Sequence, residues 1–340
     1  MKIILMLQIA LLTIVSSFTI SAQPKIIFDT DIGSDADDLG ALAMLHTFVK
    51  RGDCELLAVM SWTLEENAVQ AIDAINRYYF HPDIPIGTRK GSTFKDDANY
   101  NRAIVDNFSH KLSYDDVPDA TSLYRKILSE AADSSITIVT VGPLANIQNL
   151  INSGPDQHSN LTGNKLITKK VKEFVIMGGK FPKGKKEWNF NGNMPGVTRY
   201  VLENLTVPIT FSGFEVGEKI KTGAIFNQTD PETPLYKGFL YFSSHAPWIK
   251  GQFKGKILDN SSFDQTAVLY AVKGNTSGHW TKITGGYCKA DDTGGNKWVK
   301  NRKSNHSYLK IKGSPELLAT LIEVLMLDKV NEVIDMEETK

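Results

Sequence analysis

The chain has 340 residues, with 38 basic and 38 acidic side chains and a formal net charge of zero at neutral pH. No segment is basic enough to indicate binding to nucleic acid, and this charge balance argues against a protein of that class. The length is large for one domain but compatible with one.

The first 22 residues have the pattern of a secretory signal peptide. A single lysine precedes an apolar run over residues 3–15, and small residues follow up to Ala22. The run is short for a membrane span, and no later run reaches the required length of about 18 apolar residues. We therefore predict cleavage before Gln23, with 1–22 as signal peptide and 23–340 as a periplasmic or secreted chain free of the membrane. A retained N-terminal anchor is the alternative.

Strand-like and helix-like segments alternate along the predicted mature chain. Buried strands are expected at 25–30, 54–62, 83–88, 135–142, 171–179 and 207–215. Helices are expected at 37–52, 64–80, 119–132, 144–153, 264–272 and 315–328. This alternation is typical of an α/β fold, here a single domain with a mostly parallel, Rossmann-like sheet flanked by helices. A small antiparallel hairpin is expected within the Gly- and Lys-rich stretch 251–313.

Two cysteines, Cys54 and Cys288, lie far apart in the sequence. In an exported protein they could form a disulfide bond. Two unpaired buried thiols are the slightly preferred interpretation.

The segment DTDIGSDADD, residues 29–38, places five aspartates between the first strand and the first helix. Helix capping accounts for one or two of them. Five are too many for that role, because neighbouring carboxylates repel and raise each other's pKa. A hard divalent cation such as Ca²⁺, which takes about six to eight oxygen ligands, resolves the repulsion. Binding sites of open α/β sheets lie beyond the carboxyl ends of the strands, so the loops after Val141, Met177 and Gly213 are expected nearby.

Two enzyme families place D-x-D at the end of a strand. Haloacid-dehalogenase-type phosphatases need Thr or Val two residues after the second Asp, where this chain has Gly33. A second family matches better, because six segments of this chain resemble its motifs and occur in the same order. They are residues 29–38, 140–147, 171–179, 187–193, 207–216 and 262–272. They read DTDIGSDADD, TVGPLANI, VKEFVIMGG, EWNFNGN, VPITFSGFEV and SFDQTAVLYAV. Through them the chain resembles the inosine–uridine-preferring nucleoside hydrolases, from about residue 25 to 272 and more weakly beyond.

The resemblance implies a calcium site and a reaction. The ligands would be Asp31, Asp38, the backbone carbonyl of Val141, and Asp264. The ion would hold the ribose 2′- and 3′-hydroxyls and the attacking water, and Asp31 would be the general base. The reaction implied is hydrolysis of the N-glycosidic bond of a ribonucleoside through an oxocarbenium-like transition state.

Several residues match substrate contacts of the family. Asp37, Glu187 and Asn189 correspond to residues that hold the ribose hydroxyls. Asn146 either contacts the sugar or supports its loop. Trp62, or its neighbour Ser61, stands where the family usually has Asn after the second strand.

The sequence also departs from the family pattern. The first motif is two residues longer than usual, so Asp35 is an alternative metal ligand. Phe263 stands where many members have a His that protonates the leaving base. The segment 226–248 is expected above the site, where its aromatic residues and His245 could stack on the base or protonate it; ordinary packing is the alternative. Without another acid, the enzyme is expected to prefer purine nucleosides.

Two other functions stay open at this point. One is an exported relative that acts on another N-ribosyl or modified-sugar compound. The other is a non-catalytic ribose-binding homologue. Retention of Asp31, Asp38 and Asp264 favours an enzyme. A homo-oligomer, either a dimer or a tetramer, is expected, and the preferred base is not fixed by the sequence.

Overall fold

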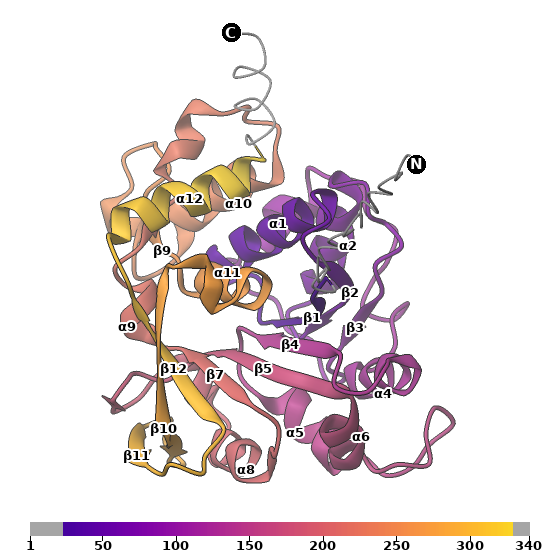
Figure 1. The fold of residues 1–340 in the computed structure, drawn as a ribbon. Helices are drawn as coiled ribbons and strands as arrows, with labels where there is room; N and C mark the ends of the chain where they lie inside the picture. The colour runs from indigo at the N-terminus through magenta and orange to yellow at the C-terminus, as the bar shows by residue number, and fades with distance from the viewer. Residues whose placement is uncertain (1–22, 329–340) are drawn as a thin grey trace, which may run out of the picture.

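The computed structural model describes residues 23–328, and the predicted signal peptide lies outside them. A large sheet runs through the molecule with helices on both faces (Figure 1). Within the described residues, none of the helices combines the length and the apolar character that a membrane crossing requires.

The main sheet has the strand order β3-β2-β1-β4-β5-β7-β12-β10-β11-β6. The first seven strands in this order are mutually parallel, and the last three pair antiparallel. The parallel strands are β1 (Lys25–Thr30), β2 (Glu55–Ser61), β3 (Ile86–Thr88), β4 (Ile136–Thr140), β5 (Val171–Met177), β7 (Ile209–Ser212) and β12 (His306–Ile311). The antiparallel strands are β10 (Trp280–Ala290), β11 (Asn296–Lys300) and β6 (Lys183–Gly184), and a separate pair joins β8 (Lys221–Thr222) to β9 (Asn260–Ser261).

Two helical layers cover the sheet. One layer contains α1 (Asp37–Lys50), α2 (Ala68–Tyr78), α10 (Pro234–His245), α11 (Phe263–Lys273) and α12 (Pro315–Leu327). The other contains α4 (Ala120–Glu130), α5 (Ala145–Asn152), α6 (Gly163–Lys170) and α8 (Val197–Asn204). Short helices complete the set: α3 (Asn101–Val105), α7 (Trp188–Asn191) and α9 (Phe214–Gly217).

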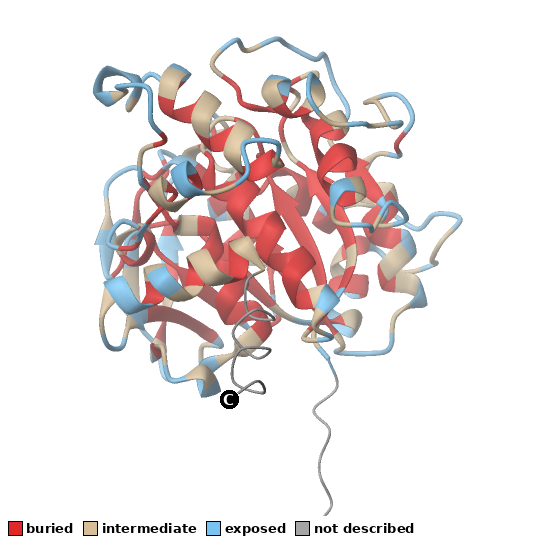
Figure 2. Cartoon of the chain, turned by 90° about the horizontal axis from the view of Figure 1, so that it is seen from above, coloured by how far each residue is buried: buried red, intermediate tan, exposed pale blue. Residues whose placement is uncertain are grey.

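Alternation along the strands divides the core between the two layers. Ile26 and Phe28 of β1 pack with the α1 layer, whereas Ile27 between them packs with the α4 layer. Successive side chains of a strand point to opposite faces, so a strand buried on both sides is apolar throughout. Figure 2 shows this burial along the central strands and the inner surfaces of the helices.

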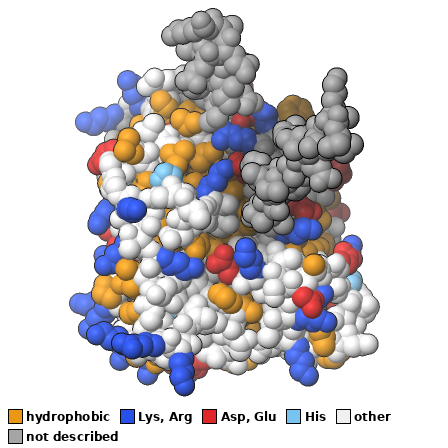
Figure 3. Space-filling model, viewed as in Figure 1, with side chains coloured by type: hydrophobic (Ala, Val, Ile, Leu, Met, Phe, Trp, Pro, Cys, Tyr) orange, Lys and Arg blue, Asp and Glu red, His pale blue; other side chains and the backbone are white. Residues whose placement is uncertain are grey.

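The predicted fold class is confirmed, with a few differences in the elements. α2 begins at Ala68 rather than at residue 64. The expected hairpin is present as β10 and β11, and it extends the main sheet through β12. Figure 3 shows basic side chains gathered at the lower left, where this hairpin lies. Cys54 and Cys288 are both buried and free, as the preferred interpretation predicted, and lie in opposite layers of the core.

Candidate active site

The loops that follow β1, β4, β5 and β7 meet at a pocket of about 680 Å³. Asp31, Val141 and Phe214 line it from just beyond β1, β4 and β7, and Met177 lines it from the last position of β5, which confirms the predicted juxtaposition. The sequence-predicted residues that line the pocket are Asp31, Asp35, Asp37, Asp38, Trp62, Val141, Glu187, Asn189, Phe263 and Asp264. Asn146 and His245 are absent from the lining.

The aspartate loop is shaped by contacts from a distant segment. Gly33 has φ +133°, and a Cβ at this position would collide with the Asn99 side chain. Asn101 Nδ2 donates to the carbonyl of Ile32 at 3.0 Å and to the Glu65 carboxylate at 3.0 Å. These supports, which the sequence analysis did not identify, hold the loop that carries Asp31 into the pocket.

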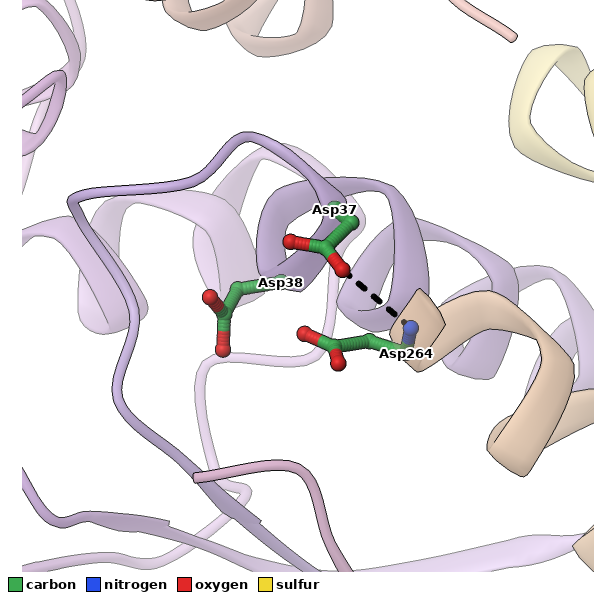
Figure 4. A group of neighbouring side chains, drawn as sticks. All are labelled: Asp37, Asp38 and Asp264. Carbon is green, nitrogen blue, oxygen red and sulfur yellow. Dashed lines mark hydrogen bonds between the residues drawn. The ribbon is translucent and has the colours of Figure 1, made fainter. Parts of the chain in front are cut away.

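Three carboxylates form a buried cluster where the first turns of α1 and α11 meet (Figure 4). Oxygens of Asp37, Asp38 and Asp264, one from each, lie within 4.8 Å of one another. The Asp264 amide donates to Asp37 Oδ2 at 3.3 Å, and the Thr30 hydroxyl donates to Asp38. Helix N-termini favour negative charge, so both helices contribute to holding the cluster.

This grouping differs from the predicted ligand set. Asp37, expected to hold the ribose, joins Asp38 and Asp264 in the cluster, while Asp31 lies outside this group of three. Asp31 is nevertheless close, because its charge raises the pKa values of Asp38 and Asp264. The Asp35 carboxylate accepts a hydrogen bond from Asn260.

The acidic side chains in and beside the cluster resist ionisation. Burial raises the pKa of Asp31 to about 7 and that of Asp35 to about 6. Burial, and then the charges of the neighbouring aspartates, raise the pKa values of Asp37, Asp38 and Asp264 well above their usual range. A divalent cation relieves both effects at once, so the donor set fits a hard metal ion.

Residues after β5 form a second wall of the pocket. Glu187 caps α7, accepting from the backbone amides of Gly179 (2.8 Å), Asn189 (3.0 Å) and Phe190 (3.0 Å). Asn189 Nδ2 donates to the Val141 carbonyl at 2.7 Å, the carbonyl that was predicted as a metal ligand. A carbonyl oxygen has two lone pairs, so this bond leaves one for a cation.

Asn146 supports the aspartate loop from behind rather than facing the pocket. Its Nδ2 donates to both oxygens of Asp29, at 3.1 and 3.2 Å, and to the Ser61 carbonyl at 3.3 Å. The Tyr124 hydroxyl donates to Asp29 Oδ2 at 2.8 Å. Burial raises the pKa of Asp29 to about 7. The geometry therefore favours the loop-supporting role that the sequence left open for Asn146.

Aromatic side chains surround the pocket entrance. Trp62 and Phe263 line it as expected, and Phe263 stacks on Phe214 with ring centroids 4.9 Å apart. Phe94 and Trp188 also line it and were not predicted, and the Trp188 indole N–H donates to Asp31 Oδ2 at 2.9 Å.

The segment 226–248 contributes less to the site than expected. Of this segment only Trp248 lines the pocket. His245 ends α10 as an exposed residue, stacks on Tyr241 at 3.8 Å between ring centroids, and places Nδ1 3.0 Å from the Tyr241 carbonyl. The structure therefore does not bring His245 to the pocket, because its ring is held on its own helix.

Comparisons with known proteins agree on the family and the fold. A plant nucleoside hydrolase, PpNRh1, superposes with a TM-score of 0.67 at 17% identity, covering 89% of this chain and 98% of that one. The inosine-uridine preferring nucleoside hydrolase of Bacillus anthracis has a TM-score of 0.64 at 14% identity, covering 91% and 100%. An inosine-guanosine nucleoside hydrolase has a TM-score of 0.60 at 18% identity, covering 91% and 99%.

Comparison with individual curated proteins gives no match in sequence. A family model described as "Inosine-uridine preferring nucleoside hydrolase" matches residues 26–308. This match covers most of the chain and includes every residue of the acidic cluster. The chain therefore belongs to the inosine-uridine preferring nucleoside hydrolase family.

Proposed function

We propose that the protein hydrolyses the N-glycosidic bond of ribonucleosides with a bound Ca²⁺ ion, and that Asp31 is the general base. The observation that carries this proposal is the buried cluster of Asp37, Asp38 and Asp264 beside Asp31 in the pocket. Family membership supports the reaction class.

The cluster supports a hard cation with oxygen ligands. Asp37, Asp38 and Asp264 offer carboxylate oxygens, and Asp31 and the Val141 carbonyl line the same pocket. All are oxygen donors, which is the ligand class of Ca²⁺. When bound, the ion would supply charge for orienting a water molecule and two ribose hydroxyls and for lowering the pKa of that water.

Asp31 is suited to accept the water proton. It lines the pocket, and the Trp188 indole N–H fixes one of its oxygens at 2.9 Å. Burial raises its pKa to about 7, close to the pH at which a general base is most effective. The nearby carboxylates stabilise the positive charge that develops on the ribose.

The aromatic residues around the entrance define where the base would bind. Trp62, Trp248 and Phe263 offer flat surfaces for stacking. Neither Phe263 nor the distant His245 can protonate the leaving base from the pocket. Purines accept a proton from solvent more readily than pyrimidines, so we propose a preference for purine nucleosides.

We also propose that the protein acts outside the cytoplasm, in the periplasm or as a secreted enzyme. The support is the N-terminal pattern of one lysine, an apolar run and small residues up to Ala22.

Turnover and metal content of matched aspartate variants test the proposal. Asp31→Asn should lower ribose release from inosine by about 10²- to 10⁴-fold, the usual contribution of a general base. Asp264→Ala should lose both activity and bound metal. Asp96→Asn, which changes another aspartate of the pocket lining, should keep both. Turnover by Asp31→Asn at the wild-type rate would contradict the assigned role.

A further inference from the structure

A group of lysines lies along one side of the pocket. The segment 180–186 reads KFPKGKK, and Lys180, Lys185 and Lys186 line the pocket, whereas Lys183 in β6 does not. We call Lys180, Lys185 and Lys186 the lysine rim. All three are exposed, in contrast to the buried carboxylates of the cluster.

The charges of the lysine rim are free for a ligand. Among residues 23–328, no carboxylate oxygen lies within 4.0 Å of the ammonium group of Lys180, Lys185 or Lys186. Lys180 Nζ lies 5.0 Å from the centre of the Phe214 ring, which holds its charge at the pocket edge. Although carboxylates also line this pocket, lysines without a carboxylate partner attract the anionic groups of a ligand.

The part of the substrate nearest the lysine rim can be inferred from the contacts proposed for the three ribose hydroxyls. A ribonucleoside has free hydroxyls at C2′, C3′ and C5′, and the first two are assigned to the cation and its aspartates. Glu187 and Asn189 are therefore left for the 5′-hydroxyl. Lys185 and Lys186 directly precede Glu187 in the chain. Lys185, Lys186, Glu187 and Asn189 line the same pocket, so the lysine rim borders the space in which the 5′-hydroxyl is proposed to bind.

We propose that the preferred substrates are 5′-phosphorylated ribonucleosides, with the phosphate bound by the lysine rim. This inference rests on the proposed function and narrows its substrate class. Water adds to C1′ and its proton passes to Asp31, while the C1′–N bond breaks and its electron pair leaves with the base. The base then takes up a proton, and the products are the free base and ribose 5-phosphate.

The arrangement of charge in the pocket is consistent with such a substrate. The acids that would hold the cation and ribose are buried at the floor, and the lysines are exposed at the rim. One further acid, Asp96, lines the pocket from a segment that is distant in sequence from the lysine rim. The volume of about 680 Å³ is well within the range of pockets that enclose whole ligands.

The test compares inosine 5′-monophosphate with inosine. The wild-type protein should show a kcat/KM at least about ten-fold higher for the monophosphate, the lower limit of electrostatic steering by a charged cleft. The double variant Lys185→Ala/Lys186→Ala should lose most of this ratio. Lys183→Ala, which removes a neighbouring lysine outside the pocket, should keep it. A wild-type ratio of one or less, or an unchanged ratio in the double variant, would overturn the inference.

A binding measurement separates this inference from the proposed reaction. If the wild-type protein cleaves neither compound, the proposed function fails, and calorimetry with ribose 5-phosphate and ribose still tests the rim. Tighter binding of ribose 5-phosphate, lost in the double variant and retained in Lys183→Ala, supports the inference. Equal binding of the two sugars, or equal competition by inorganic phosphate and ribose 5-phosphate, overturns it.

Discussion

Replacing Asp264 by Asn should have opposite effects on stability with and without the metal ion. Oxygens of Asp37, Asp38 and Asp264 lie within 4.8 Å of one another, so each ionised pair costs at least about 3.5 kcal/mol at an effective dielectric constant of about 20. Three such pairs cost about 10 kcal/mol, which approaches the whole stability of a typical domain. Without a cation, the folded protein must therefore hold protons on this cluster.

The consequence is a pH dependence with a defined sign. The pKa of Asp264 is raised in the folded state, so its contribution to stability is complete below the unfolded pKa near 3.8 and is lost as the pH rises toward the folded pKa. A proton that the folded state holds and the unfolded chain has released costs about 1.4 kcal/mol of stability for each unit of pH, or roughly 2–3 °C in Tm. Asp264→Asn removes this group, so in chelator its advantage over the wild type should grow with pH.

Thermal and urea unfolding at pH 6 and pH 8, in chelator and in excess Ca²⁺, test this prediction. Saturating calcium should stabilise the wild type by about 2.7 kcal/mol at a concentration of about 100 Kd, and the variant much less. Asp83→Asn changes an exposed aspartate and serves as the matched control. The reasoning would be refuted if, in chelator, the free energies of unfolding of wild type and Asp264→Asn changed equally with pH, and if calcium stabilised both proteins equally.

Four further predictions concern the loop support, the leaving group and the N-terminus. Asn146→Ala removes a buried hydrogen-bond partner of Asp29 and should lower the free energy of unfolding by about 1–3 kcal/mol, measured in urea. An unchanged free energy of unfolding would contradict the supporting role of Asn146. His245→Ala should release ribose from inosine at the wild-type rate, since its ring lies outside the pocket, and a large loss would place it in the site. The wild type should cleave inosine faster than uridine, and equal rates would show that Phe263 has no bearing on the leaving group. Protein from the native host should begin at Gln23, and an intact N-terminal Met would contradict export.

The sequence predicted six of the seven parallel strands, all but β12, because a strand buried on both faces is largely apolar. In β5, for example, the buried residues 174–177 read FVIM and are followed by two glycines. α6 and α8 had no comparable signal: α6 begins with Gly163 and α8 follows Gly196, with no side-chain cap on either. Packing against α5 and β10, rather than local pattern, determines where these helices form.

The position of the site was predictable, but the grouping within it was not. A strand that ends in aspartates must present them at the carboxyl edge of the sheet, so the aspartate loop could be placed from its sequence. Which carboxylates meet depends on where α1 begins after a first motif that is two residues longer than usual. It also depends on how α11 approaches α1. Asn101, which holds the loop through the Ile32 carbonyl, is 69 positions away in the sequence. No local pattern reveals a contact of that kind.

Ribose release from inosine by metal-depleted and reconstituted protein tests the central claim most directly. The purified mature chain should contain about one tightly held Ca²⁺ per molecule. Removing the ion should abolish turnover, and adding Ca²⁺ back should restore it in the wild type but not in Asp264→Ala. Full turnover in excess chelator, by a protein shown to contain no divalent metal, would contradict the account.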